Sequence, residues 1–397
     1  MKVTDTIKYV GVNDHQVDLF EGQYKVPNGM SYNSYVILDE KIAVMDTVDA
    51  NFTHQWLDNI QQVLENRKPD YLIVQHMEPD HAANIANFLK AYPDTTVVAT
   101  AKAFNMIDNF FELKLEGQKI EMGNGGTLSL GYHQLTFVFA PMVHWPETMV
   151  TFDETEGILF SGDAFGCFGA LNGGCIDRNI NTDIYWNEMR RYYANIVGKF
   201  GNPVQKALQK CGGLPIKTIC PTHGPVWEEC IPQVVDMYDK LSRYEGEEGV
   251  VIVYGTMYGN TEELAEAIAE ELSAQGIKNI ILHNVSHTHH SYILADIFKY
   301  KALIAGCTTY NMHLYPEMES LLSKVAAREM KNRLFGYFGS FTWASAAVKK
   351  LGEFTEKLKF EVVGNPVEMK QSMKADNYAQ AKELAKAMAD RLKADRK

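Results

Sequence analysis

The 397-residue sequence has few cysteines, and no two of them are closely spaced. The cysteines are Cys167, Cys175, Cys211, Cys220, Cys230 and Cys307. A disulfide framework is not expected at this length without a signal peptide. Because no C-x-x-C pair is present, a built-in iron–sulfur or rubredoxin-type module is not expected either. Any redox partner of that kind would be a separate protein.

Long apolar runs and basic clusters are also missing. Runs such as Tyr71–Val74 and Val250–Tyr254 are far too short to span a bilayer, and the first six residues do not resemble a signal peptide. Lys and Arg total 38 against 50 Asp and Glu, a net charge of −12. Nucleic acid and acidic membrane are therefore poor partners. The sequence predicts a soluble cytoplasmic protein.

The composition changes near residue 245. Residues 243–249 are charged, glycine-punctuated and poor in apolar side chains, which is typical of a linker. The length favours two or three domains. We therefore predict two domains, residues 1–248 and residues 249–397.

The first part has short apolar runs with helical segments such as Asn51–Asn66 between some of them. The predicted strands are Tyr35–Leu38, Ile42–Met45, Tyr71–Val74, Thr96–Ala99, Leu135–Ala140, Met149–Phe152, Ile158–Phe160 and Ile216–Cys220. This pattern favours sheets with helices packed outside them.

The second part alternates regularly between strand and helix patterns. The predicted strands are Val250–Tyr254, Ile280–Val285, Ala302–Gly306, Leu334–Phe338 and Phe360–Val363. The predicted helices are Thr261–Gln275, His290–Phe298, Pro316–Ala327, Ala344–Leu358 and Ala375–Arg391. Five strands interleaved with helices predict a doubly wound parallel sheet.

Potential metal ligands are concentrated in the segment from His76 to His81, directly after an apolar strand. Alternate residues of an extended segment point to the same side, so His76, Glu78 and Asp80 could share one centre. A set of imidazole and carboxylate ligands suits iron or manganese better than a thiolate set would.

Three further candidates follow apolar strands beside glycine or proline. They are His144, Asp163 and His223. Strand ends are where sites gather in layered α/β folds. A single histidine at such a place is more often an ordinary polar residue than a ligand. The six residues together indicate a metal site much more strongly than any one of them.

A loop rich in threonine and glycine joins the strand Val250–Tyr254 to the next helix. Its candidate residues are Thr256, Met257, Tyr258, Gly259, Asn260 and Thr261. Such a loop at a helix N-terminus can hold a phosphate, although an ordinary capped helix start is the alternative. The loop contains neither G-K-[ST] nor G-x-G-x-x-G, so a mononucleotide is favoured over a triphosphate or a dinucleotide.

Two more loops follow the third and fourth strands of this part. Their candidate residues are Thr308, Thr309, Tyr310, Asn311, Ser340, Phe341, Thr342, Trp343 and Ala344. In a sheet of order 2-1-3-4-5, the first, third and fourth strand ends surround the switch point. Tyr310 and Trp343 could flank an isoalloxazine ring, or they could be ordinary surface aromatics.

These motifs carry a family resemblance. The pattern H-x-[EH]-x-D-H, followed at long intervals by His, Asp and His, is the metallo-β-lactamase-type layout, in which common hydrolases have a second histidine where this chain has Glu78. The three loops resemble flavodoxin, whose cofactor is FMN. Together they resemble the flavodiiron proteins. The resemblance implies an N-terminal αββα metallo-β-lactamase-like domain and a C-terminal flavodoxin-like domain.

The resemblance also implies roles for the candidate ligands. His76, Glu78 and His144 would hold one iron, Asp80 and His223 would hold the second, and Asp163 would bridge them. His81 lies on the second iron in some family members and off it in others, so its role stays open. An open metal position would accept O₂ or NO.

The implied function is a terminal oxidoreductase in which FMN passes electrons to a di-iron site that reduces O₂ to water or NO to nitrous oxide. The choice between the two gases stays open. The resemblance favours rubredoxin as the electron donor, and a head-to-tail homodimer or a dimer of dimers (a homotetramer). One alternative is a metal hydrolase of the lactamase fold with an accessory flavodoxin domain, which Glu78 argues against. Another is an electron carrier with a docking scaffold, which the six-residue ligand set argues against.

Overall fold

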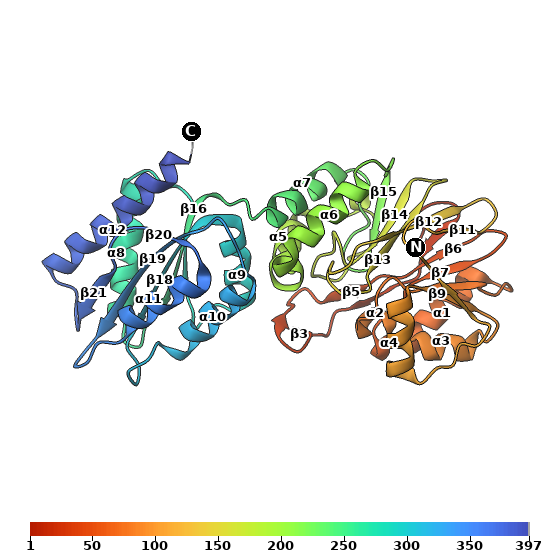
Figure 1. Ribbon diagram of the computed structural model, residues 1–397, viewed down its shortest axis with the longest axis horizontal. Helices are drawn as coiled ribbons and strands as arrows, with labels where there is room; N and C mark the ends of the chain where they lie inside the picture. Colours follow the sequence, from red (N-terminus) through yellow and green to blue (C-terminus); the bar gives the residue numbers. More distant parts are fainter. Residues whose placement is uncertain (396–397) are drawn as a thin grey trace. The chain divides into compact units, whose positions relative to one another are not determined.

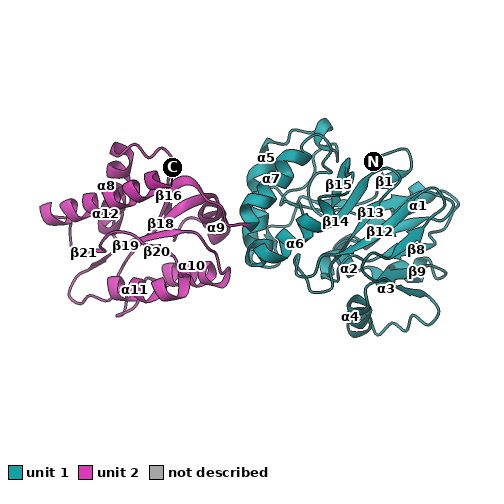
Figure 2. Ribbon diagram, turned by 45° about the horizontal axis from the view of Figure 1, so that its top comes forward, with its two compact units in different colours: residues 1–242 teal, residues 243–397 magenta. Residues whose placement is uncertain are grey.

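The chain folds into two compact units, which Figure 2 shows in different colours. The computed structural model describes residues 1–395. Unit 1 is Met1–Ser242 and unit 2 begins at Arg243, so the division comes after residue 242 rather than after residue 248. The strand β16 (Glu247–Gly255) starts inside the segment that we expected to be a linker.

The first residues of unit 2 are fixed to the rest of that unit by Arg333. Its side chain is 2% exposed and donates hydrogen bonds to the carbonyl oxygens of Tyr244, Ile297 and Phe298. Burial lowers the pKa of this guanidinium to about 10. Residue 244 is therefore part of the packed unit, although its sequence neighbourhood is typical of a linker.

Unit 1 contains two sheets and two small ribbons. The first sheet has the order β1-β6-β7-β8-β9-β10, the second has the order β11-β12-β13-β14-β15, and the ribbons are β2-β5 and β3-β4. The strands are β1 (Ile7–Tyr9), β2 (Val12–Asp14), β3 (Leu19–Phe20), β4 (Tyr24–Lys25), β5 (Met30–Tyr32), β6 (Tyr35–Ile37), β7 (Ala43–Met45), β8 (Tyr71–Ile73), β9 (Thr96–Ala99), β10 (Lys119–Glu121), β11 (Thr127–Ser129), β12 (Gln134–Phe139), β13 (Met149–Asp153), β14 (Ile158–Gly162) and β15 (Thr218–Pro221).

Helices cover the outer faces of the two sheets, so the unit has the expected αββα layering. In Figure 1, α1 to α4 lie on the side of the first sheet, and α5 to α7 lie on the side of the second. The helices are α1 (Thr53–Leu64), α2 (Pro79–Ala82), α3 (Ile85–Ala91), α4 (Ala101–Phe111), α5 (Asp183–Tyr192), α6 (Gly201–Cys211) and α7 (Ile231–Ser242), with short helical turns η1 (Ala50–Phe52), η2 (Asp177–Asn179), η3 (Tyr193–Val197) and η4 (Gly198–Phe200).

The strand directions explain where side chains from distant segments can meet. In the second sheet, β12 and β14 are both antiparallel to β13, and β15 is parallel to β14. The C-terminal ends of β12, β14 and β15 therefore lie at one edge of that sheet. Each of the three is followed by a candidate metal ligand.

Unit 2 is a parallel sheet of order β17-β16-β18-β19-β20, which is the predicted order 2-1-3-4-5. Its strands after β16 are β17 (Ile280–Asn284), β18 (Tyr300–Thr308), β19 (Leu334–Phe341), β20 (Glu361–Val362) and β21 (Val367–Lys370). The predicted fifth strand, Phe360–Val363, contains β20, whereas β21 was not predicted. Both pair with β19, on either side of Gly364, whose φ is +73°.

The described residues of unit 2 also form five helices: α8 (Asn260–Ala274), α9 (His290–Lys299), α10 (Pro316–Ala327), α11 (Ala347–Leu358) and α12 (Ala375–Ala394). In Figure 1, α8 and α12 lie beside one another on one face of the sheet. Their apolar side chains share a core with the strands, for example Leu264 and Leu384 with Ile252, Ile304 and Phe338. The helix α11 begins three residues later than predicted, because residues 342–346 belong to a loop.

The predicted α/β fold class is confirmed for both units. The six cysteines, all of which the structure describes, are free thiols. Among residues 1–395, no helix combines the length and the apolar character that a bilayer span requires.

Candidate metal centre and cofactor pocket

Four of the predicted ligands form one cluster in unit 1. Ligand atoms of His76, Glu78, His144 and Asp163 all lie within 4.8 Å of one another. The His144 Nε2 atom is 2.8 Å from Glu78 Oε2 and 3.0 Å from Asp163 Oδ2. The His76 Nε2 atom is 3.5 Å from the same Asp163 oxygen. The segments that follow β8, β12 and β14 thus contribute ligands to one cluster.

Asp80, His81 and His223 form a second cluster. The Asp80 Oδ2 atom lies 3.3 Å from His81 Nε2 and 3.2 Å from His223 Nε2. Both histidines are fully buried. The structure therefore places His81 in the second cluster. The sequence alone left open whether His81 belongs to that cluster.

Asp163 lies between the two clusters. Its Oδ2 atom faces His76 and His144, whereas its Oδ1 atom lies 3.4 Å from His81 Nε2 and 4.0 Å from His223 Nε2. The Thr222 hydroxyl donates a hydrogen bond of 2.5 Å to Oδ1. A carboxylate that offers one oxygen to each of two clusters has the arrangement of a bridging ligand.

Neighbouring groups fix the segments that carry these ligands. The Glu147 carboxylate accepts a hydrogen bond of 2.8 Å from the amide nitrogen of Met77, between two ligands. The His223 Nδ1 atom lies 2.7 Å from the Ser31 carbonyl oxygen, so Nδ1 carries the proton and Nε2 is free to bind a metal. Gly224 follows at φ +77°, and a side chain there would meet Cys167 Sγ.

Backbone conformations that favour glycine occur at non-glycine residues beside the site. Asp46 after β7 has φ +52°, Met142 after β12 has φ +65°, and Phe165 after β14 has φ +66°. Such conformations cost energy and concentrate at functional sites. The buried Asp46 carboxylate accepts two hydrogen bonds from Gln75, the residue before His76. These supporting residues have no recognisable sequence pattern.

The clusters are strongly charged. Burial alone would raise the pKa of Glu78, but the hydrogen bond from His144 and the nearby His76 ring outweigh it and lower the pKa to about 2. Burial lowers the pKa of His144, but Asp163 and Glu78 outweigh it and raise that pKa to about 10. Asp163 is held well below its usual pKa, mainly by His76 and His144 against the effect of burial. The carboxyl groups of Glu78 and Asp163 are thus held in their ionised form, although they are buried.

The buried polar atoms of this site fit metal ions. Both ring nitrogens of His76 and both carboxylate oxygens of Asp80 are buried without a hydrogen-bond partner in the described part of the chain. Buried polar groups without partners are rare in folded proteins, and an ion is one of the standard explanations. Two adjacent groups with nitrogen and oxygen ligands and no thiolate suit iron.

Aromatic side chains surround His223. The rings of Phe20, Tyr32 and Tyr192 lie 5.5, 5.9 and 5.6 Å from its ring, measured between centroids. Tyr192 is fully buried, and its hydroxyl has no hydrogen-bond partner among residues 1–395. Sequence reasoning missed these residues because they lie far apart in the chain and belong to no motif.

A large pocket lies at the C-terminal edge of the sheet in unit 2. Its volume is about 740 Å³, which is within the usual range of about 300–1,000 Å³ for small-molecule sites. The three predicted loops line it together with residues 371 and 372. The lining residues are Thr256, Met257, Tyr258, Asn260, Thr261, Thr308, Thr309, Asn311, Met312, Ser340, Phe341, Thr342, Trp343, Ala344, Gln371 and Ser372.

Two predicted residues do not line this pocket. Gly259 has φ +93° and caps α8, where its amide nitrogen donates to the Thr256 hydroxyl. Tyr310 is held in a tight turn with His313, and its ring lies against Tyr315. Met312, Gln371 and Ser372 were not predicted, because no motif marks them. Of the two predicted aromatics, Trp343 lines the pocket, whereas Tyr310 does not.

The pocket fits a flavin mononucleotide. The N-terminus of the 15-residue helix α8 and the hydroxyl of Thr256 lie at one side, and a helix N-terminus attracts a phosphate. Thr261 and Ser340, from two different loops, are joined by a hydrogen bond of 2.8 Å between their hydroxyls. The Thr309 hydroxyl accepts hydrogen bonds from the amide nitrogens of Ala346 and Ala347. These bonds connect the loop after β18 to the start of α11.

Family models match both units. Residues 30–224 match the ODP family beta lactamase model, and residues 252–387 match the flavodoxin model. The first match contains all the candidate metal ligands, and the second contains all three predicted loops. The family-model matches therefore agree with the two-part fold.

Whole-chain relatives combine these two halves. An anaerobic nitric oxide reductase flavorubredoxin of Escherichia coli O1:K1 is 32% identical over 374 residues, which is 91% of this chain and 76% of the relative. A nitric oxide reductase of Moorella thermoacetica is 31% identical over 92% of this chain and 91% of its own length.

Solved structures agree with these relatives. The rubredoxin oxygen:oxidoreductase of Desulfovibrio gigas has a TM-score of 0.95 at 30% identity and covers 99% of this chain and 98% of its own. The flavodiiron protein of Giardia intestinalis has a TM-score of 0.92 at 25% identity, with 99% and 96% covered. The expected resemblance is confirmed: the chain belongs to the flavodiiron protein family.

Proposed function

We propose that this protein reduces O₂ to water, NO to nitrous oxide, or both, with electrons that pass through FMN to a non-haem di-iron site. The observation that carries the proposal is the position of Asp163, with one oxygen toward each of two ligand clusters. A two-metal site with this mixed ligand set occurs in the same chain as a flavodoxin-type pocket. Similar proteins are named as a nitric oxide reductase and a rubredoxin oxygen:oxidoreductase, which agrees with this proposal.

The residues of unit 1 divide between the two metal positions. We assign His76, Glu78 and His144 to the first iron, Asp80, His81 and His223 to the second, and Asp163 to both. When bound, the irons would supply the open coordination position and the redox change that gas reduction requires. Glu78, where common hydrolases of this fold have histidine, adds a negative charge that favours iron over zinc hydrolase chemistry.

Unit 2 would hold the FMN. The α8 N-terminus and the threonine hydroxyls would bind the phosphate, and Trp343, which is 89% exposed, would cover one face of the ring. Together, one flavin and two irons can store the four electrons that reduction of O₂ to water consumes. We propose a rubredoxin-type protein as the electron donor, in line with the name of the similar rubredoxin oxygen:oxidoreductase.

We further propose that two chains pair head to tail, so that the FMN of one chain serves the irons of the other. Large apolar side chains with little cover gather at the flavin pocket, and Met257, Tyr258, Met312 and Trp343 are 46, 90, 53 and 89% exposed. Exposed apolar groups at the rim of a site mark a surface that a partner covers. In a homodimer with two-fold symmetry, each chain would cover these side chains of the other chain.

One experiment tests the activity. Purified protein is analysed for iron, zinc and FMN, reduced without oxygen, and then given O₂ or NO in separate electrode measurements. We expect about two irons and one FMN per chain, and consumption of at least one gas that depends on iron. Zinc in place of iron, or reduced holoprotein that consumes neither gas, would contradict the proposal. The ratio of the two rates decides the preference between O₂ and NO.

A further inference from the structure

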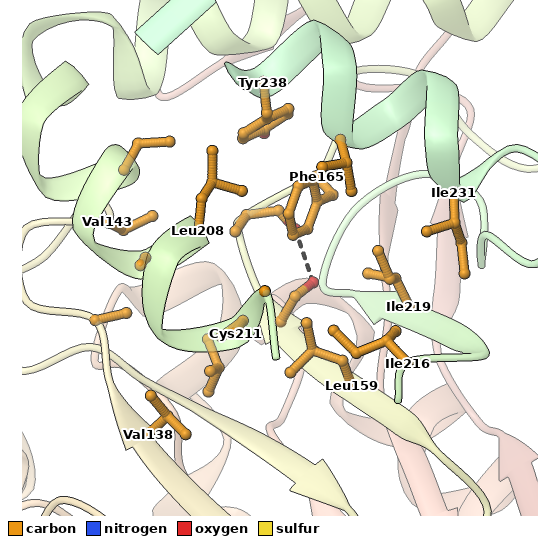
Figure 3. A pocket seen from close by; sticks show the side chains of 18 residues that line it. Val138, Val143, Leu159, Phe165, Leu208, Cys211, Ile216, Ile219, Ile231 and Tyr238 are labelled. Carbon is orange, nitrogen blue, oxygen red and sulfur yellow. Dashed lines mark hydrogen bonds between the residues drawn. The ribbon is translucent and has the colours of Figure 1, made fainter. Parts of the chain in front are cut away.

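An apolar pocket lies between the second sheet of unit 1 and the helices α6 and α7 (Figure 3). Its volume is about 90 Å³. The labelled side chains in Figure 3 come from the sheet, for example Leu159 and Ile219, and from the helices, for example Leu208 and Tyr238. The hydroxyl of Ser161, one of the few polar groups of the lining, donates a hydrogen bond to the Ala164 carbonyl oxygen. The hydroxyl of Tyr238, which also lines the pocket, is buried without a hydrogen-bond partner among residues 1–395. The pocket therefore offers few free polar atoms to a ligand.

Two chain segments that line this pocket each carry a candidate metal ligand. Val143 lines the pocket and directly precedes His144. Ser161 and Ala164 line it on either side of Asp163. The pocket therefore lies next to the first metal position. The same chain segments line the pocket and carry two of the ligands of that position.

Exposure changes from one end of the pocket to the other. Val143, Leu159 and Ile219 are at most 2% exposed, whereas Leu208 of α6 and Val235 of α7 are partly exposed. The lining therefore extends from the protein surface between two helices to the buried strand ends at the metal site.

The size and the lining limit the ligand to a small apolar molecule. Water in such a site would lack the two to four polar partners that it needs. In general, an apolar cavity of about 150 Å³ in a protein stays dry and binds benzene or xenon. A space of about 90 Å³ is too small for a drug-sized molecule but holds a diatomic gas. O₂ and NO are neutral and form only weak hydrogen bonds with water.

We propose that this pocket binds the diatomic gas substrate and raises its local concentration next to His144 and Asp163. The inference rests on the proposed gas reduction. It assigns a place for the substrate in addition to the open metal position, and it predicts that the pocket affects the KM for the gas rather than the chemical step.

The first test uses xenon, an apolar atom that shows whether the pocket can bind a small apolar ligand and that undergoes no reaction. Crystals of the holoprotein are pressurised with xenon, and the expected result is a xenon atom between Leu159, Phe165 and Leu208. In Leu208→Phe, whose larger side chain fills the space, xenon should be lost, and in Leu208→Ala its occupancy should rise. Absence of xenon from the wild-type pocket would overturn the proposal, whatever the enzyme reduces.

The second test measures kinetics with the same variants. We expect Leu208→Phe to raise the KM for the reduced gas by about threefold or more with little change in kcat, because only substrate binding is weakened. Gln209→Phe adds the same ring to the exposed neighbouring position of α6 and is the matched control. Iron content, FMN content and thermal stability of each variant show whether it is folded. Loss of xenon without a rise in KM beyond that of the control would overturn the substrate role.

Discussion

The Nε2 atom of His81 lies 2.9 Å from the Nε2 atom of His223. Since His223 uses Nδ1 to donate to the Ser31 carbonyl oxygen, its Nε2 offers a lone pair toward His81. Asp80 Oδ2 lies within 3.3 Å of both nitrogens. Three ligand atoms therefore converge on one small volume, where a metal ion would bind all three.

We predict that His81→Asn weakens binding of the second iron by about tenfold or more, because the position loses one of its three terminal ligands. The measurement is iron content per chain after dialysis against a graded chelator, together with FMN content as an internal reference. His54→Asn, at an exposed histidine of the same unit, is the control. An iron affinity equal to that of the control would place His81 off the iron.

The role of Glu78 can be tested by restoring the histidine of the hydrolase pattern. In Glu78→His the first position loses a negative charge that lies 2.8 Å from His144 Nε2. We expect weaker iron retention and a fall in gas reduction of about a hundredfold or more, while FMN stays bound because its pocket is in the other unit. Atomic absorption, the flavin spectrum and gas electrodes measure the three effects.

An exposed carboxylate provides the control for that change. Glu121→His introduces the same side chain away from the ligands and should leave iron, FMN and activity as in the wild type. Loss of FMN from Glu78→His with both irons retained would show that the two sites are assigned to the wrong units.

A buried ion pair predicts a pH dependence of stability in unit 1. His133 Nδ1 lies 2.9 Å from Asp153 Oδ2, and both side chains are fully buried. Burial lowers the pKa of His133, but the hydrogen bond and the charge of Asp153 outweigh it, so that the folded-state pKa is raised above 6.5. The stabilisation is therefore complete below the unfolded-state pKa and is lost as the pH rises through the folded-state value.

We expect His133→Gln to reduce the free energy of unfolding by about 2 kcal/mol at pH 6, where a hydrogen bond between charged groups is lost. The difference from the wild type should shrink steadily toward pH 9. Thermal unfolding of unit 1 at a series of pH values measures it, with His15→Gln at an exposed position as control. A difference that grows with pH would contradict the assigned sign.

The candidate metal ligands could be recognised in the sequence because they lie in segments that follow apolar strands. Parallel strands place their C-terminal ends at one edge, so Asp163 and His223, which are far apart in the sequence, come to the same place. The flavin loops were predictable for the same reason, since β16, β18 and β19 are parallel neighbours. Strand order and residue type were sufficient for these features.

Features that depend on packing were not predictable. Tyr310 lies outside the pocket lining, with its ring 6.5 Å from that of Tyr315, and Tyr192 lies 5.6 Å from the His223 ring although no motif marks it. The two- and three-residue strands β1 to β5 are too short to produce a periodic pattern. The charge of residues 243–249 indicated a linker, but Arg333 binds the Tyr244 carbonyl and makes this segment part of unit 2.

The head-to-tail dimer can be tested with two variants that are inactive for different reasons. His144→Ala removes a ligand of the first iron and leaves the flavin pocket intact. The double change Thr256→Glu and Asn260→Asp adds negative charge to the loop that would hold the phosphate and leaves the irons intact. In a mixed dimer, the flavin of the first variant would face the irons of the second. One working pair would form, although neither chain is active by itself.

Equal amounts of the two variants, carrying different affinity tags, are unfolded and refolded together with iron and FMN. Random pairing makes half of the dimers mixed, and each mixed dimer has one working pair of two, so activity should reach about a quarter of the wild-type value. Each variant refolded alone, and the two mixed without unfolding, should stay inactive. Mixed dimers that are isolated through both tags and remain inactive would show that electrons pass within one chain. A holoprotein that sediments as a monomer with full activity would exclude the dimer itself.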